Sequence, residues 1–309
     1  MIIYKDMTKD YADGPWKYID FQKYIPKDLQ PDCIFGCCIS SRVKDFSDFK
    51  YKILLENEEP NAYFINHPDY IDETNEKKWD KIITLCPYTT KWINNKYKNN
   101  RRIYAGWYPI EPDIYPINTT YDYDVCYAGS MPNAQCELHK TIDIISQYKY
   151  AYINFTGDGR SNFKNITSEK KLEIISKSKI TIAYNLLFPT RGSHNLNYPD
   201  NEAFSHNDEF VVPQYKWRIA ESMMCKSLIL VRKDYWNLIE NFYKPDEDFI
   251  YFSSLKDLKL KMDNILSNFD NYKHIIESAY NKTKNLYNTE RFCKDIIINT
   301  LNILKEDNK

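Results

Sequence analysis

The second half of the chain alternates short apolar runs with amphipathic stretches. The runs have strand length and carry no polar alternation, which is typical of parallel strands covered on both faces. Strands are expected at residues 124–128, 150–156, 180–185, 228–231 and 249–252. Helices are expected at residues 133–148 and 168–178, before the strand at 228, from Trp236, and at 254–268 and 270–308 with a break near Asn288. This alternation predicts a doubly wound α/β domain.

The first half shows a less regular version of the same pattern. Strands are expected at residues 33–39, 51–55, 81–85 and 102–105, with a helix at 87–96 that begins near a proline. Residues 1–30 have no firm period, so we expect an irregular lead-in there.

A proline-rich passage separates the two halves. Pro109, Pro112 and Pro116 fall in a stretch with little periodicity, which is typical of an interdomain linker. We place the boundary near residue 118, giving a first domain at 1–118 and a second domain at 119–309. The chain of 309 residues has room for both.

Charge and hydropathy exclude several classes of protein. Lys and Arg together number 42 and Asp and Glu together 43, so the net charge of −1 argues against binding nucleic acid. No apolar stretch approaches the roughly 20 residues that span a bilayer, and the first residues lack a signal-peptide core. We therefore expect a soluble, cytoplasmic protein without a transmembrane segment.

The eight cysteines are scattered along the chain. Cys126, Cys225 and Cys293 have apolar neighbours and are interpreted as reduced, buried side chains. Residues 33–38 hold three further cysteines, but no second pair of ligands stands at a usable spacing, so core packing is favoured over zinc.

Only seven glycines occur, so the position of each is informative. Gly129 follows the apolar run at 124–128, and Gly157 with Gly159 follows the run at 150–156. These are the carboxyl ends of predicted strands, where α/β proteins bind ligands. For residues 157–160 a simple turn and a ligand loop are equally favoured.

Arg218 and Glu221 stand three residues apart on the predicted helix before residue 228. They therefore share one face, while Ile219 and Met223 turn toward the interior. Taken alone, the two charges are adequately explained as a surface pair worth about 0.2–0.5 kcal/mol.

Five segments in order resemble the nucleotide-sugar-binding domain of GT-B glycosyltransferases, of the spore-protein type called glycosyltransferase family 1-like. They are Asp-Val-Cys-Tyr-Ala-Gly-Ser at 124–130, the strand ending in Asn185, the Arg-x-x-Glu helix at 218–225, the strand and helix start at 249–258, and the stretch at 287–292. The resemblance covers residues 122–300 and implies two Rossmann-like domains that face each other across a cleft.

The resemblance implies a nucleotide-sugar donor site in the second domain. A diphosphate needs backbone N–H groups and a cation, which Gly129, Ser130 and Arg218 would supply. Glu221 would accept hydrogen bonds from ribose or sugar hydroxyls. The remaining donor-site residues predicted on this basis are Gly157, Asn185, Arg191 and Ser222.

Two sequence features bear on a metal and on the donor pocket. Asp122-Tyr123-Asp124 has the Asp-x-Asp form of a metal site, but it precedes a strand, so we interpret it as structural and expect neither a metal nor another cofactor. Lys226 replaces the glycine usual in the family, and would crowd the pocket, contact phosphate, or plug the site.

The first domain would hold the acceptor and, in an inverting enzyme, a general base. His67, in Asn-His-Pro-Asp, titrates in the useful range, and Asp69 follows it. Glu56, Glu58 and Glu59 are further candidates after the second strand.

We therefore predict a glycosyltransferase that moves a hexosyl or pentosyl group from a nucleotide-sugar to a glycan or glycoconjugate hydroxyl. Two alternatives remain: a sugar-nucleotide epimerase-like enzyme, and a non-catalytic binding or scaffold protein that retains the fold.

Overall fold

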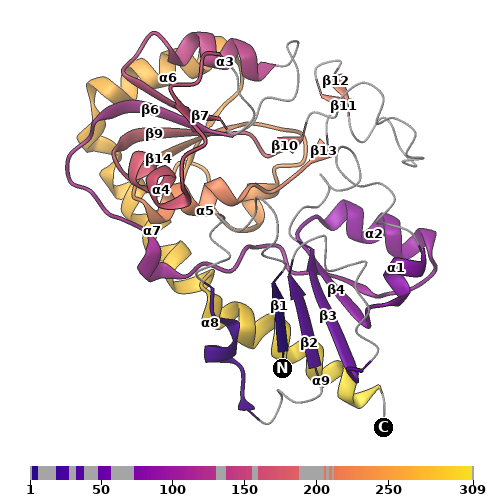
Figure 1. Cartoon of the computed structure of the whole chain (residues 1–309). Coiled ribbons are helices and arrows are strands. Elements are labelled where there is room, and N and C mark those ends of the chain that lie inside the picture. The colour runs from indigo at the N-terminus through magenta and orange to yellow at the C-terminus, as the bar shows by residue number, and fades with distance from the viewer. Residues whose placement is uncertain are drawn as a thin grey trace.

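The computed structural model describes ten segments of the chain. These are residues 2–5, 19–27, 33–37, 48–56, 73–129, 137–154, 159–187, 205–206, 209–210 and 212–307. The elements form two lobes, each built around a parallel sheet (Figure 1). This confirms the α/β class expected from the alternation of strands and helices.

The first sheet contains five parallel strands in chain order. They are β1 (Ile2–Lys5), β2 (Cys33–Cys37), β3 (Tyr51–Glu56), β4 (Lys81–Thr84) and β5 (Arg102–Tyr104). The helices α1 (Glu73–Lys77) and α2 (Pro87–Lys96) belong to this lobe (Figure 1). An irregular lead-in is wrong for residues 2–5, because this short run pairs with β2 in parallel.

The second sheet contains six strands in the order β15-β14-β9-β6-β7-β8, all parallel. Their bounds are β6 (Tyr123–Ala128), β7 (Tyr150–Asn154), β8 (Phe163–Lys164), β9 (Ser178–Ala183), β14 (Leu228–Arg232) and β15 (Ile250–Phe252). From β6 the chain builds outward to β7 and β8, then returns to the other side of β6 with β9. The topological switch point therefore lies between β6 and β9, where doubly wound proteins bind ligands.

Helices cover both faces of this sheet. On one face, Val125 and Leu230 pack with α3 (Glu137–Ile145) and α6 (Leu255–Ser267). On the other, Cys126 and Ile153 pack with α4 (Ser168–Ser176) and α5 (Trp217–Met224). Burial on both faces explains why the strands have no polar alternation.

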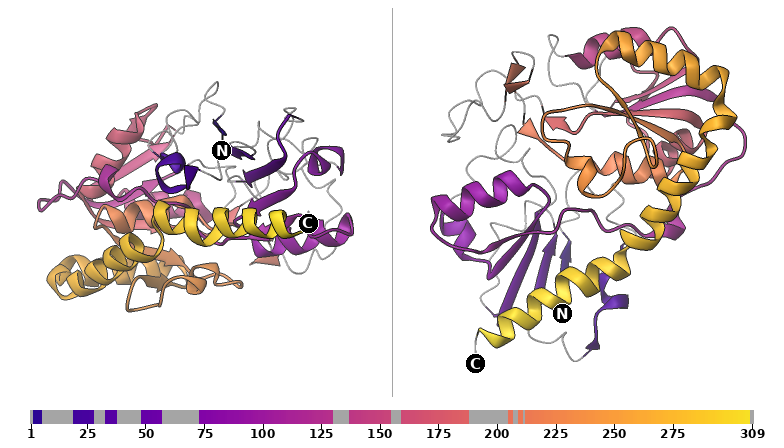
Figure 2. Two further views of the ribbon diagram at one scale, coloured as in Figure 1. Left: turned by 90° about the horizontal axis from the view of Figure 1, so that it is seen from below. Right: turned by 180° about the vertical axis from the view of Figure 1, so that it is seen from behind.

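The C-terminal helices connect the two lobes. They are α7 (Lys273–Leu286), α8 (Thr289–Phe292), a π-helical turn (Cys293–Ile298) and α9 (Asn299–Glu306). After the predicted break near Asn288 they run along the first lobe (Figures 1 and 2). Leu301 of α9 belongs to the same apolar cluster as Ile53 and Ile83 of the first sheet. The C-terminal helices thus follow the second lobe in the sequence but pack on the first lobe. The domain boundary at residue 118 stays a prediction.

A helix from Trp236 is wrong. The Asp234 carboxylate accepts hydrogen bonds from the N–H groups of Trp236 and Asn237, and Asn237 has a left-handed φ of 47°. That conformation interrupts a helix, so only a short 3₁₀ turn forms, Leu238–Asn241. Between β9 and α5 the chain adds two short antiparallel pairs. One is β10 (Leu186–Leu187) with β13 (Val212–Pro213), and the other is β11 (Ser205–His206) with β12 (Glu209–Phe210).

Two observations concern the sequence expectations on membranes and cysteines. Within the described ranges, no helix is both long and apolar enough to cross a bilayer. The cysteines at 126, 225 and 293 are buried and free, as predicted, and Cys86 shares this state.

Candidate functional site

The guanidinium of Arg218 lies over the carboxyl end of β6. Arg218 stands in the first turn of α5, on one face of the sheet, and its Cζ is 5.2 Å from the ring centroid of Tyr127, which packs on the other face. The side chain therefore crosses the edge of the sheet at Gly129. A Cβ added to Gly129 would lie 2.6 Å from that Cζ, so a side chain there would displace the guanidinium.

Gly129 contributes space to this arrangement. Its N–H donates to the carbonyl of Ile153 at 2.9 Å, which extends the pairing of β6 with β7 by one residue. That N–H is therefore committed to the sheet, contrary to the expectation that it would face a phosphate. The glycine is needed because Arg218 occupies the place of a side chain.

Asn185 fixes the start of α5 from the end of β9. Its carbonyl accepts the N–H of Gln214 at 2.8 Å, and its Oδ1 accepts the N–H of Lys216 at 3.3 Å. Asn185 is fully buried, and its Nδ2 has no hydrogen-bond partner in the part of the chain that the structure describes. Gly129, directly after β6, and Asn185, two residues after β9, thus both lie at the switch point.

Lys216 is a second cation at this end of α5, and sequence reasoning missed it. Its Nζ donates to Oε1 of Gln214. Burial, together with repulsion from Arg218, holds the pKa of Lys216 well below its usual value. Neither Lys216 nor Arg218 pairs with a carboxylate among the described residues, and the first turn of α5 has no acidic residue. Two positive charges at the positive end of a helix dipole repel each other unless an anion is present. The signal for Lys216 in the sequence is therefore a lysine and an arginine at the start of a helix that has no acidic residue in its first turn.

Glu221 lies one turn further along α5 and pairs with α4. Its Oε1 is 2.6 Å from Nζ of Lys171, and the two side chains are 2% and 14% exposed. The Lys171–Glu221 pair is therefore largely withdrawn from water. The sequence alone was also consistent with an exposed pair between Arg218 and Glu221, but Glu221 pairs with Lys171 instead. Lys171 gave no signal in the sequence, because its partner is fifty residues away.

Ser222 is fully buried and its hydroxyl donates to the carbonyl of Arg218 at 2.6 Å. The hydroxyl thus bonds back along its own helix, a common arrangement for serine within helices. In this structure Ser222 supports the turn that bears Arg218.

Lys226 lies beyond the opposite end of α5. Its φ of 54° and the bonds Lys226 N–H to Met223 and Ser227 N–H to Ser222 form a Schellman motif, whose left-handed position favours glycine. This explains the glycine usual in the family. Nζ of Lys226 lies 2.6 Å from Glu277 and 4.5 Å from the Tyr280 ring centroid, both on α7. Lys226 therefore does not plug the Arg218 end of the helix.

Asp122 and Asp124 lie at the amino end of β6, opposite the switch point. They are 3.4 Å from Nζ of Lys177 and 3.3 Å from Nζ of Lys179. Both carboxylates thus stabilise the start of the strand, as the sequence indicated. No group of three or more His, Cys, Asp or Glu side chains with metal-site geometry occurs within the described segments.

A buried charged group stands at the carboxyl end of β14, beside β9. Nε of Arg232 donates to Oε1 of Glu137 at 2.8 Å. Asp234 is 4% exposed, and one of its carboxylate oxygens has no hydrogen-bond partner in the described part of the chain. Burial raises the pKa of Asp234 to about 6.

Five predicted site residues lie outside the described residues, and they remain predictions. They are His67, Asp69, Ser130, Gly157 and Arg191. Glu58 and Glu59 lie outside them too, whereas Glu56 is fully buried at the carboxyl end of β3.

Two parallel-sheet lobes, with a cationic helix end at the switch point of the second, define the GT-B class of fold. The model of the family described as glycosyl transferase-like matches residues 136–297. That is more than half of the chain, and the chain belongs to this family. This confirms the family expected from the sequence.

Solved structures agree on the fold. TarM of S. aureus matches with a TM-score of 0.57 and 11% identity, over 88% of this chain and 54% of TarM. Anabaena HepE in complex with UDP-glucose matches with a TM-score of 0.56 and 9% identity, over 91% of this chain and 81% of HepE. Sucrose-phosphate synthase from Thermosynechococcus elongatus matches with a TM-score of 0.57 and 10% identity, over 95% of this chain and 82% of the synthase. The chain spans about half the length of TarM, and no curated protein sequence matches it.

Proposed function

We propose that the chain binds a nucleoside diphosphate-sugar beside the carboxyl ends of β6 and β9 and transfers the sugar to an acceptor hydroxyl. The observation that carries this proposal is the position of Arg218. Its guanidinium lies at the switch point, over a glycine, and has no carboxylate partner among the described residues. A doubly charged diphosphate is the anion that suits a guanidinium beside a helix N-terminus.

The leaving diphosphate gains charge as the sugar departs, so fixed positive charge favours the transition state. Arg218 would provide that charge, and a bound anion would raise the pKa of Lys216 and so favour its charged form. Asn185 holds the backbone of Lys216 and thereby the start of the helix. Glu221, fixed by Lys171, would accept hydrogen bonds from the ribose hydroxyls. Ser222 would act indirectly, through its bond to the Arg218 carbonyl.

In the reaction the bond between the anomeric carbon and the diphosphate oxygen breaks, and the acceptor oxygen bonds to that carbon. The acceptor proton goes to a base. We assign that base in an inverting reaction to His67, with Asp69 as the second candidate, and we keep Ser130, Gly157 and Arg191 as proposed donor contacts. A retaining reaction would not require such a base.

The donor we propose first is a uridine diphosphate hexose. HepE was solved with UDP-glucose, and another TarM structure with UDP. The acceptor class we propose is a glycan or glycoconjugate hydroxyl, received by residues 1–118. No metal has an assigned role in this scheme, because Arg218 and the helix dipole supply positive charge at the diphosphate.

The test is donor turnover by the full chain. UDP-, GDP- and dTDP-hexoses and UDP-xylose are offered with glycan acceptors, and nucleoside diphosphate release is measured. One donor is expected to be consumed, with kcat/KM reduced about 100-fold in Arg218→Ala. The matched control is Arg291→Ala, which removes an exposed arginine paired with Asp295. The proposal fails if wild type consumes no donor, or if both variants behave as wild type.

A further inference from the structure

The segment that enters α5 is held by aromatic side chains from outside its own lobe. Tyr108, in the passage between the two sheets, stacks on Trp217 with ring centroids 4.7 Å apart and an interplanar angle of 24°. It also lies 6.1 Å from Tyr215 at the same angle, and its hydroxyl donates to the Tyr215 carbonyl at 3.3 Å. One buried side chain therefore contacts both residues that flank Lys216, directly before Arg218.

Tyr215 is enclosed from its other side by Phe242. The two rings lie 5.1 Å apart at 61°. Phe242 also packs on the interdomain passage, because a Cβ on Gly106 would lie 2.7 Å from its Cζ, and Gly106 has a φ of 91° that favours glycine. The rings of Tyr108 and Phe242 thus hold Tyr215 between the passage and the second lobe.

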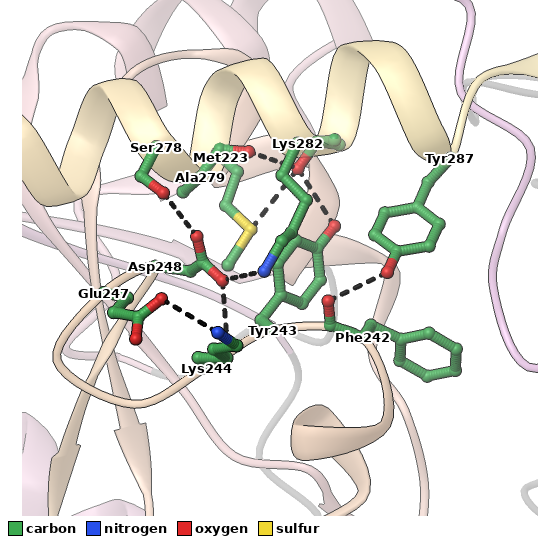
Figure 3. Close-up of polar contacts among 11 residues, drawn as sticks. Met223, Phe242, Tyr243, Lys244, Glu247, Asp248, Ser278, Ala279, Lys282 and Tyr287 are labelled. Carbon is green, nitrogen blue, oxygen red and sulfur yellow. Dashed lines mark hydrogen bonds and ion pairs between the residues drawn. The ribbon is translucent and has the colours of Figure 1, made fainter.

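A polar network anchors Phe242 to α7. Asp248 accepts from Ser278 at 2.7 Å and from the Lys244 N–H at 2.8 Å, and it pairs with Lys282. Figure 3 shows Asp248 between Ser278 and Lys282, with the hydroxyl of Tyr287 directed at the Phe242 carbonyl, 2.8 Å away. These contacts hold the segment that bears Phe242 against the end of α7.

The passage and the C-terminal crossing are also joined to each other. The Ile110 N–H donates to the carbonyl of Tyr287 at 3.2 Å, and the Thr289 N–H donates to Ile110 at 2.8 Å. Trp107, beside Tyr108, lies 5.7 Å from Tyr287. The two segments that connect the lobes therefore meet at the residues that pack on the start of α5.

We propose that Tyr108 is a positioning residue for the donor site: by stacking on Trp217 it fixes the first turn of α5 and so places the Arg218 guanidinium over Gly129. This inference rests on the proposed function for the ligand that Arg218 binds. Tyr108 itself does not touch the donor. Its role is to make the geometry of Arg218 depend on the passage between the lobes.

The first measurement needs no ligand. Amide hydrogen exchange of residues 212–224 is compared in Tyr108→Leu, Tyr108→Phe and Tyr51→Leu. Tyr51 is the matched control, since it is 4% exposed against 5% for Tyr108 and belongs to the same apolar cluster. We expect faster exchange in this segment for Tyr108→Leu alone, with Phe retaining protection. Equal exchange in Tyr108→Leu and Tyr51→Leu overturns the inference.

The second measurement is a double-variant cycle on UDP affinity. Loss of an aromatic pair of this kind should lower the UDP affinity of Tyr108→Leu about 3- to 10-fold, and the affinity of Tyr108→Phe should stay within about twofold of wild type. In an Arg218→Ala background, Tyr108→Leu should cause no further loss, because both changes remove the same contact. An additive loss means that Tyr108 does not act through Arg218 and overturns the inference.

Two outcomes need separate treatment. If Tyr108→Leu does not fold, Trp217→Leu removes the other ring of the stack at a partly exposed position and must give the same exchange pattern. If wild type binds none of UDP, GDP or ADP, the proposed function fails, and the exchange measurement alone decides the inference on Tyr108.

Discussion

Arg218 occupies the space that a side chain at Gly129 would fill. The two residues are 89 positions apart in the chain, and they meet because α5 begins beside the carboxyl end of β6. A glycine at the end of one strand thus allows a guanidinium from the opposite face of the sheet to cross the switch point. This one contact explains two sequence features, the glycine at position 129 and the arginine at position 218.

Gly129→Ala tests this contact. The added Cβ would lie 2.6 Å from Cζ of Arg218, so the guanidinium must move. We expect UDP affinity to fall about tenfold or more, as for loss of one charge-assisted contact. The control is Arg291→Ala, which removes an exposed arginine paired with Asp295. Equal affinities for the two variants in a calorimetric titration would refute the contact.

Lys216 predicts proton uptake on nucleotide binding. Burial and Arg218 lower the pKa of Lys216 in the free protein, and a bound diphosphate would raise it again. Titration with UDP across a range of pH, in two buffers of different ionisation enthalpy, should therefore show proton uptake where the pH lies between the pKa values of Lys216 in the free and bound protein. Lys216→Arg keeps the charge at all pH values and should abolish the uptake while retaining most of the affinity. Identical uptake in both proteins would contradict the assignment.

The raised pKa of Asp234 predicts that replacing this residue with asparagine stabilises the protein in a pH-dependent way. Its pKa of about 6 is raised by burial, so the folded chain binds this proton more tightly than the unfolded chain. The stabilisation is therefore present below about pH 4 and is lost as pH rises through 6. Asp234→Asn should raise stability by roughly 2–3 kcal/mol at pH 7.5, and the difference should vanish near pH 4. Thermal unfolding at the two pH values measures it; a constant difference would exclude the titration.

Breaking the ion pair between Glu76 and Arg102 in the first lobe should cause a large loss of stability. They form a buried bidentate pair, with Arg102 Nε 3.1 Å from Glu76 Oε2 and both side chains at most 1% exposed. Glu76→Gln removes the negative charge of this buried pair and should cost roughly 3–5 kcal/mol. Glu73→Gln breaks the exposed pair with Lys77 and should change stability by less than about 1 kcal/mol. Urea unfolding that gave equal losses would contradict this ranking.

The sequence predicted the elements that depend on local pattern. α2 begins at Pro87, β6 and β14 match their apolar runs, and the C-terminal helices break near Asn288. Gly129 could be placed at the site because it follows a predicted strand, where α/β proteins bind ligands, whereas Asn185 was placed there by the family resemblance.

Features set by distant contacts could not be predicted. β1 is four residues long and is recognised only by its pairing with β2. Lys171 is fixed by Glu221 of another helix, and the direction of Lys226 depends on Glu277 of α7. Pattern within one segment carries no information on such partners.

The most direct test of the account is calorimetric titration of the full chain with UDP, GDP and ADP, on wild type, Arg218→Ala and Arg291→Ala. We predict saturable binding of one nucleotide by wild type and Arg291→Ala, weakened roughly 10- to 100-fold in Arg218→Ala. No binding by wild type, or equal binding by wild type and Arg218→Ala, would contradict a diphosphate site at the switch point.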